Sequence, residues 1–149
     1  MQVADFLQPG DVLVGLDAPT KLKALQLLSK RASATLGIAE TAIFEPLYAR
    51  EKLGSTGIGE GAAIPHTRVA GLEKPFGLLC RLAKQIDFEA IDETPVDLLF
   101  VLLVPAAGGK DHLNVLAAIA RQLRSPGMLK KLREGETAGE LYAVMTTGA

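Results

Sequence analysis

The chain has 149 residues, 48% of them apolar, which suits one compact domain with a sizeable hydrophobic core. Its 16 basic and 17 acidic residues give a formal net charge of −1, and no run of Lys and Arg exceeds a pair, so the sequence lacks the basic patch of a nucleic-acid-binding protein. Cys80, the only cysteine, rules out an intrachain disulfide, and its apolar neighbours favour a buried structural thiol.

Neither the N-terminus nor the longest apolar run suggests a secreted or a membrane protein. Residues 1–5 lack the charged start and the long apolar stretch of a signal peptide. The longest apolar run, 98–104, is far too short to span a bilayer. We therefore expect a cytoplasmic protein.

The first predicted elements are a strand over 11–16 and a helix that follows it. Asp17 or Ala18 is expected to cap the helix, Pro19 suits its first turn, and Gly37 ends it. Five apolar residues at helical spacing predict its buried stripe: Leu22, Leu25, Leu28, Ala32 and Leu36.

A second helix is predicted over about 41–53, although Pro46 should either delay its start or kink it. It ends at a Gly-rich loop, 54–61. Residues 62–64 then form a short strand that leads into Pro65 and His66, so that His66 ends this strand.

The strongest strand signals are 76–83 and 96–104. The second is apolar at nearly every residue, which indicates a central strand covered on both faces. The hairpin-like spacing of the two strands favours a mixed sheet, and strands combined with helices predict an α/β sandwich in a single domain, 1–149.

Three helices are predicted after the central strand. The first covers about 110–123, a short one runs from Ser125-Pro126 to Arg133, and the last begins at a capping box formed by Thr137 and Glu140. Their expected inward-facing residues are Leu113, Leu116, Ala117, Ala120 and Leu123 on the first, and Leu141, Val144 and Met145 on the last.

The two histidines stand at places where α/β proteins build sites. His66 follows the Gly-rich loop, and His112 lies in the first turn of a helix, after the loop 105–109 that leaves the central strand, so both could meet at one edge of the sheet. A neutral imidazole is a good nucleophile near neutral pH, and it can accept a phosphoryl group.

A phosphoryl group on His66 would need hydrogen-bond donors, because it brings roughly −1.5 to −2 charges and three acceptor oxygens. Arg50, in the last turn before the loop, can supply a guanidinium, and Ser55 and Thr56 lie in the loop. Two further candidate donors to the phosphoryl group are the backbone N–H groups of the loop, such as that of Gly57, and His112.

Each of these residues also has a simpler interpretation. A lone histidine is usually structural, Arg50 can be a solvated helix residue, and the glycines match neither a P-loop nor a dinucleotide fingerprint.

A metal site from His66, His112 and Asp111 lacks a recognisable ligand spacing, so we expect no metal and no other cofactor. No G-x-S-x-G elbow supports a hydrolase. The acidic residues Asp87, Glu89, Asp92, Glu93 and Asp97 predict a solvated turn.

Two long segments resemble a known family. Residues 50–59 and 61–66 look like the active-site signature of enzyme IIA domains of the bacterial phosphotransferase system, mannitol/fructose type. Residues 86–100 are similar to the nitrogen-regulatory subfamily in particular, and His112-Leu113 resembles the segment that carries the family's second histidine. The resemblance extends from Leu13 to Met145.

This resemblance implies a three-layer α/β/α sandwich around a mixed, mostly five-stranded sheet. It implies that His66 is the phosphorylated residue, that Arg50 and His112 flank the phosphoryl group, and that residues of the loop bind it. The donor would be a histidine phosphocarrier protein charged from phosphoenolpyruvate through an enzyme I. Members of the subfamily regulate protein partners, such as a sensor kinase or a potassium transport protein, according to their phosphorylation state.

Three residues depart from the family pattern. Ala62 stands where a larger apolar residue is expected, Glu60 where Asn is common, and Pro46 in the helix that presents Arg50. A carboxylate beside a phosphoryl group would be repulsive, so we expect Glu60 to point away from the site.

Three functions follow, from different classes. The first is a phosphocarrier regulator of the nitrogen branch, and the second is a sugar-specific enzyme IIA that passes its phosphoryl group to a separate permease component. The third is a binding module that has kept the fold and lost the chemistry, which the intact set of His66, Arg50 and His112 argues against.

Overall fold

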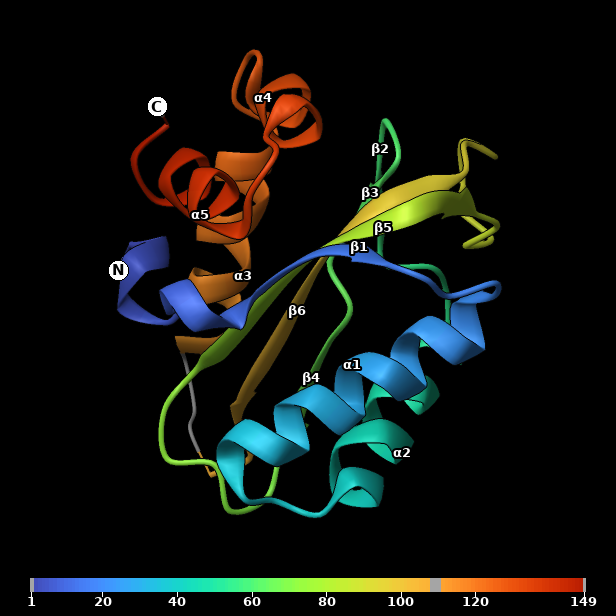
Figure 1. Ribbon diagram of the computed structural model, residues 1–149. Coiled ribbons are helices and arrows are strands. Elements are labelled where there is room, and N and C mark those ends of the chain that lie inside the picture. Colours follow the sequence, from blue (N-terminus) through green and yellow to red (C-terminus); the bar gives the residue numbers. More distant parts are fainter. Residues whose placement is uncertain (1, 108–110, 149) are drawn as a thin grey trace.

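A computed structural model describes residues 2–107 and 111–148, and its centre is a mixed sheet (Figure 1). The strands that pair in the described residues are β1 (Val12–Leu16), β2 (Gly57–Gly59), β3 (Ala62–Ala63), β4 (His66–Val69), β5 (Phe76–Ile86) and β6 (Val96–Pro105). The sheet order is β1-β5-β6-β3-β2, and β4 also pairs with β6. The sheet is therefore six-stranded rather than mostly five-stranded, because β3 and β4 are successive pieces along the same side of β6.

Helices cover both faces of this sheet. Short 3₁₀ turns, Val3–Asp5 and Pro9–Asp11, precede the helices α1 (Lys21–Leu36), α2 (Glu40–Lys52), α3 (Asp111–Leu123), α4 (Met128–Glu134) and α5 (Ala138–Thr147). In Figure 1, α1 and α2 lie on one side of the sheet and α3, α4 and α5 on the other. This confirms the three-layer α/β/α sandwich.

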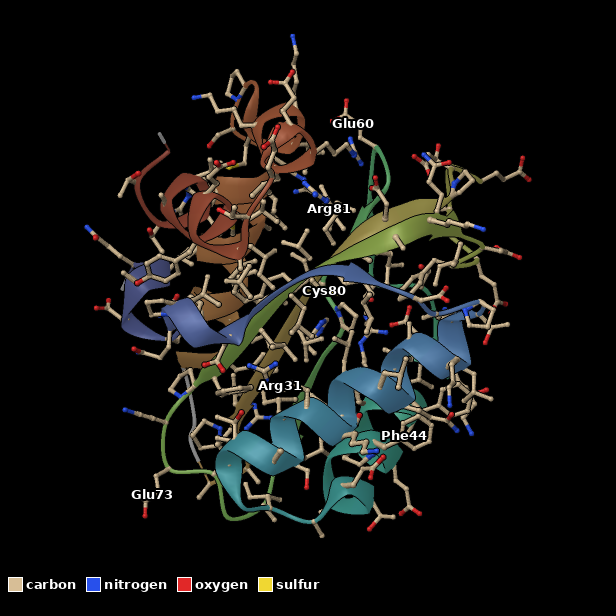
Figure 2. All side chains as sticks on the ribbon, in the orientation of Figure 1. Arg31, Phe44, Glu60, Glu73, Cys80 and Arg81 are labelled. Carbon is tan, nitrogen blue, oxygen red and sulfur yellow. The ribbon has the colours of Figure 1, made fainter. Side chains whose placement is uncertain are left out.

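Strand β6 divides the core into two halves. Its side chains alternate, so that Leu98, Phe100, Leu102 and Val104 pack with α3 to α5, whereas Leu99, Val101 and Leu103 pack with α1 and α2. The apolar run therefore does mark a strand covered on both faces. β5 pairs with β6 in antiparallel fashion and β1 pairs with β5 in parallel, which confirms the mixed sheet. Cys80 is buried in the sheet, and burial raises the pKa of its thiol to about 12 (Figure 2).

The start of α1 differs from the expectation. Thr20, and not Asp17 or Ala18, is the N-cap, because its hydroxyl accepts a hydrogen bond from the Lys23 N–H at 3.1 Å. Gly37 ends the helix in the left-handed conformation, as expected. Leu25, Leu28 and Ala32 of the expected stripe are fully buried and Leu36 is half-buried, but Leu22 is 41% exposed.

Pro46 does not delay the start of α2, because the helix begins at Glu40 and the proline lies inside it.

The expected buried stripe of α3 is partly wrong. Val115, Ile119 and Leu123 are buried, while Leu113 is 73% exposed and Ala117 is exposed. The helix is strongly amphipathic, and the expected stripe passed over Val115 and Ile119, whose four-residue spacing with Leu123 marks the buried face. Lys110, its expected first residue, lies outside the described residues.

The C-terminal helices follow their predicted order. Thr137 caps α5 by accepting from the Glu140 N–H at 3.1 Å, but Glu140 accepts from the Glu136 N–H rather than from the cap residue, so the predicted box is displaced by one residue. The inward residues of α5 are buried as expected: Leu141, Val144 and Met145.

Two arginines attach α4 to the sheet. Arg81 of β5, which points toward the C-terminal helices in Figure 2, donates to the carbonyls of Leu132 at 2.8 Å and Gly135 at 2.6 Å. Arg133 of α4 pairs with the Asp97 carboxylate at 2.9 Å and donates to the Glu60 carbonyl at 2.6 Å. Asp97, expected in a solvated turn, thus lies in β6 and helps to hold the β2–β3 hairpin against α4.

Glu60, at the tip of this hairpin, generates a prediction about stability. Its φ of 56° is a left-handed conformation, which costs a residue with a β-carbon about 1–2 kcal/mol and costs Asn less. Its N–H donates to Asp92 and its carbonyl accepts from Arg133, and both are main-chain bonds that a substitution keeps. We expect Glu60→Asn to raise the free energy of unfolding by about 0.5–1 kcal/mol in urea denaturation.

Glu60→Ala is the matched control. It removes the same carboxylate from the neighbourhood of Asp92 but keeps the steric cost of the β-carbon, so it should give no such gain. Equal stabilities of the Asn and Ala variants would show that the backbone conformation is not the cause.

Candidate functional site

The structure brings the two histidines together. The ring centroids of His66 and His112 lie 5.7 Å apart, with the ring planes inclined at 64°. His66 is the first residue of β4, not the last residue of the preceding strand as expected, because Pro65 has no N–H and interrupts the strand between β3 and β4. His112 lies in the first turn of α3, which follows β6. The expected meeting of the two imidazoles at one edge of the sheet is thus observed.

A local hydrogen bond orients the His66 ring. Nδ1 lies 2.7 Å from the carbonyl oxygen of Ile64. A carbonyl can only accept, so Nδ1 carries the hydrogen, and the neutral ring then has its lone pair on Nε2. The ring nitrogen available for chemistry is therefore Nε2.

The environment keeps His66 neutral. Burial lowers the pKa of His66 most, the Arg50 guanidinium lowers it further, and the bond to Ile64 and the Glu51 carboxylate raise it. The net effect is a pKa below its usual value, so the nucleophilic form predominates at neutral pH.

His112 is also held neutral. Burial lowers its pKa, and the charges of His66 and Arg68 lower it further. Its Nδ1 is buried and has no hydrogen-bond partner within 2–107 and 111–148. The two rings disfavour each other's protonation, so two neutral imidazoles stand side by side.

Arg50 is placed next to this pair by the end of α2. One guanidinium nitrogen donates to the Gly54 carbonyl at 2.9 Å, which folds the side chain back over the start of the loop. Its positive charge adds to burial in lowering the pKa of His66. A guanidinium carries five N–H donors, and this single bond leaves others for an anion.

The loop residues Ser55, Thr56 and Gly57 use their donors internally. The Thr56 N–H and hydroxyl both donate to the Glu51 carboxylate, at 2.9 and 2.7 Å. The Ser55 hydroxyl donates to the Phe88 carbonyl at 3.2 Å and accepts from the Gly57 N–H at 3.1 Å. These bonds give the loop a defined shape, and they occupy the donors that the sequence offered for a phosphoryl group.

Sequence reasoning missed two residues of this region. Glu51 is 4% exposed and forms an ion pair with Lys21 at 3.0 Å, yet in the sequence it stands in the charged run 50–52, which is typical of a helix surface. Arg68 follows His66 by two residues in β4, and the two-residue period of a strand places both on the same face. The two-residue spacing from His66 could therefore have indicated Arg68 from the sequence alone.

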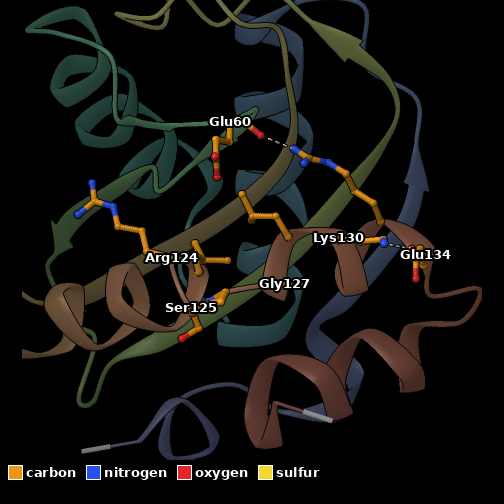
Figure 3. Close-up of a pocket in the computed structure, with 10 residues that line it drawn as sticks. Glu60, Arg124, Ser125, Gly127, Lys130 and Glu134 are labelled. Atoms are coloured by element: carbon orange, nitrogen blue, oxygen red, sulfur yellow. Dashed lines mark hydrogen bonds and ion pairs between the residues drawn. The ribbon is translucent and has the colours of Figure 1, made fainter.

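Glu60 lies away from the histidines. The Gly61 carbonyl accepts from the Leu98 N–H of β6, whereas His66 pairs with Leu102, four residues further along. At about 3.3 Å per residue these points are about 13 Å apart, so the Glu60 carboxylate does not repel a group on His66. Glu60 instead lines a cavity of about 680 Å³ together with residues of α4 and of the α3–α4 connection, including Arg124, Ser125 and Lys130 (Figure 3).

The described residues offer neither a cluster of metal ligands nor a helix suited to a membrane. In the part of the chain that the structure describes, no three His, Cys, Asp or Glu side chains gather as possible metal ligands. The Asp111 side chain, which the sequence offered as a third ligand, lies outside that part. None of the described helices has the length and apolar character needed to cross a bilayer.

Comparison with known proteins finds a solved structure with the same fold and a protein family that matches the sequence. The structure matches that of the nitrogen regulatory protein IIA-Ntr from Neisseria meningitidis with a TM-score of 0.90 and 32% identity, over 97% of this chain and 99% of that chain. Residues 5–147 match the family described as phosphoenolpyruvate-dependent sugar phosphotransferase system, EIIA 2. The chain belongs to this family of phosphotransferase-system components.

Two relatives carry different names. A nitrogen regulatory protein of Bradyrhizobium diazoefficiens is 47% identical over 145 residues, which cover 97% of this chain and 95% of the relative. A fructose-specific EIIA component of Haloferax volcanii is 40% identical over 136 residues, which cover 89% and 88%. The similarity to nitrogen regulatory proteins agrees with the resemblance found in the sequence.

The lowered pKa values of the two histidines predict a pH dependence. Both rings should titrate below about 6.5, the usual value, in an NMR titration. At a pH between the pKa values of the two histidines in the folded chain and about 6.5, their usual value, the unfolded chain then binds more protons than the folded chain. Lowering the pH through this window should therefore decrease the free energy of unfolding, with a levelling below the folded values.

A His66→Gln/His112→Gln double variant is the control, since it should lose this part of the pH dependence. Titration of either ring at or above 6.5 would contradict the burial argument.

Proposed function

We propose that this chain is a phosphocarrier that accepts a phosphoryl group on Nε2 of His66 from a histidine phosphocarrier protein and regulates protein partners according to its phosphorylation state. The observation that carries the proposal is the bond from His66 Nδ1 to Ile64, beside His112 and within reach of the charge of Arg50. A neutral, oriented imidazole next to a cation suits an acceptor of a dianionic group.

The transfer needs no proton movement on His66. The Nε2 lone pair forms the new N–P bond as the N–P bond of the donor breaks, and that electron pair stays on the imidazole of the donor. Nδ1 keeps its hydrogen and its bond to Ile64 throughout. Catalysis is then a matter of positioning and of charge stabilisation.

Arg50 and His112 are the groups proposed to stabilise the transferring phosphoryl group. Arg50 supplies charge-assisted hydrogen bonds, and His112, with an unpartnered buried Nδ1 among the described residues, is held in place by α3. The loop of Ser55, Thr56 and Gly57 is proposed to contribute its shape rather than its donors, because those donors are bonded within the loop and to its neighbours.

The surroundings suit a protein donor. Leu53, next to Gly54, is 86% exposed, and Leu113, next to His112, is 73% exposed. Leu53 thus lies three residues from Arg50 and Leu113 lies next to His112, and exposed apolar side chains near both groups favour contact with another protein surface. A phosphoryl group on His66 would change the charge of the surrounding surface by roughly −1.5 to −2 and so change which partner binds.

The nitrogen-regulatory role rests on the relatives with that name, and a sugar-specific role rests on the fructose-specific relative. Deletion of the gene separates the two. A regulator predicts no growth defect confined to one sugar, since loss of a regulator affects the pathways of its partners. A defect on a single sugar such as fructose would instead identify a sugar-specific component.

The phosphoryl acceptor can be tested directly. With phosphoenolpyruvate, enzyme I and a histidine phosphocarrier protein, the native chain should gain one phosphoryl group by intact mass spectrometry at alkaline pH, and His66→Ala should gain none. Arg50→Ala and His112→Ala should slow the gain by about 10²-fold, the usual cost of losing one group that stabilises the transition state.

Arg124→Ala is the matched control, because this arginine lies beside the cavity near α4 and should leave the rate unchanged. A phosphoryl group that persists in His66→Ala would place the acceptor elsewhere. No gain on the native chain, with the carrier verified as charged, would favour a binding module without the chemistry.

A further inference from the structure

A buried carboxylate lies behind the site, and the proposed function does not use it directly. Glu51, in the last turn of α2, is 4% exposed, although a carboxylate is among the side chains least often buried. Its charge is compensated by the Lys21 ammonium at 3.0 Å and by two hydrogen bonds from Thr56. Burial of an ionised group is tolerated only with such partners.

The bonds to Thr56 continue to His66. The Thr56 carbonyl accepts from the Ile64 N–H at 3.0 Å, and the Ile64 carbonyl accepts from His66 Nδ1 at 2.7 Å. The Gly61 and Pro65 carbonyls face β6, where they accept from Leu98 and Leu102. Alternation along the strand turns the main-chain groups of Ile64 to the other side, toward Thr56 and the imidazole.

Lys21 attaches the other end of this chain of contacts. Its ammonium also donates to the Phe88 carbonyl at 3.1 Å and lies 4.6 Å from the centre of the Phe88 ring. Phe88 is fully buried, and its carbonyl also accepts from Ser55. The start of α1, the end of α2 and the β5–β6 connection therefore meet at Lys21, which pairs with Glu51 and contacts Phe88.

We propose that Glu51 is a positioning residue, which holds His66 in the Nδ1–H tautomer through Thr56 and Ile64. The inference rests on the proposed function for its catalytic consequence, but its effect on the His66 ring stands by itself. If the carboxylate is lost, the Thr56 segment relaxes, the Ile64 carbonyl moves, and hydrogen moves from Nδ1 to Nε2 in part of the molecules. An Nε2 that carries hydrogen has no lone pair for attack.

Glu51→Gln tests this, since the amide keeps the size of the side chain and loses the charge. In ¹⁵N NMR spectra of the His66 ring, the wild type should show the Nδ1–H tautomer, and Glu51→Gln should show a mixture with the Nε2–H form. The pKa of His66 should also fall, because the Glu51 anion raises it, while Arg50 and the burial that lower it remain. Phosphoryl transfer should slow by about 10- to 10²-fold, the scale of a small misplacement.

Asp97→Asn is the matched control for stability. It removes a carboxylate from another ion pair, with Arg133 at 2.9 Å, which joins β6 to α4. It should lower the midpoint of thermal unfolding and leave the tautomer, the pKa of His66 and the transfer rate unchanged. An effect of Glu51→Gln on the His66 ring that Asp97→Asn reproduces would overturn the proposal, because it would follow from lost stability alone.

Thr56 supplies a second pair of variants in case Glu51→Gln does not fold. Thr56→Val keeps the shape and the N–H bond but loses the hydroxyl bond to Glu51, and should give a smaller shift toward the Nε2–H tautomer. Thr56→Ser keeps the hydroxyl and should restore the wild-type ring.

The outcomes separate this proposal from the proposed function. An unchanged tautomer and an unchanged pKa of His66 in both Glu51→Gln and Thr56→Val overturn the role of Glu51, whether or not the chain is phosphorylated. Failure of the native chain to accept a phosphoryl group, with the expected changes in the ring, overturns the function and leaves the positioning role supported.

Discussion

Strand β6 is buried on both faces, and this constraint determines where the helices and the other strands lie. A strand whose side chains are nearly all apolar must be covered twice, so helices pack on both sides of the sheet. β5 pairs along one edge of β6, and β3 and β4 pair in turn along the other. His66 owes its position opposite Leu102 to this pairing, because β4 can resume after Pro65 only in register with β6.

The pairing with β6 keeps one register on both sides of Pro65, since Ala63 lies opposite Leu99 and His66 lies opposite Leu102. The His66 imidazole bonds to the carbonyl of Ile64, two residues earlier on this same strand path. The His66 ring therefore depends on the path of its own backbone, and that path depends on the loop of Thr56, which is attached to Glu51. Helices on opposite faces of the sheet contribute to one edge: α2 brings Arg50, and α3 brings His112.

The sequence predicted those features that depend on strong, local signals. Long apolar runs bounded by turn residues located β5 and β6, and the positions of His66 and His112 after strands predicted that they would meet. The predicted face of α3 was wrong because the expected stripe left out Val115 and Ile119, which share a face with Leu123. The predicted cap of α1 was wrong because Asp17 and Thr20 both favour capping, and only the path of the chain selects one. Glu51 was missed because burial of a carboxylate depends on Lys21 and Thr56, one of them 30 residues away, and no local pattern reports such a contact.

Arg50 and Glu51 are neighbours in the sequence, and their opposite charges act on the same imidazole in opposite directions. Before a phosphoryl group arrives, these charges partly compensate, so burial dominates and the ring stays neutral. If the proposed function holds, a phosphoryl group on Nε2 interacts more strongly with the Arg50 guanidinium than with the Glu51 carboxylate. The half-buried Arg50 side chain has donors to offer it, whereas the Glu51 carboxylate is buried and its charge is compensated by Lys21 at 3.0 Å. Because the negative charge is enclosed in its own ion pair, the anion experiences the guanidinium more strongly than the carboxylate, and the site can bind a dianion without a large repulsive contribution from Glu51.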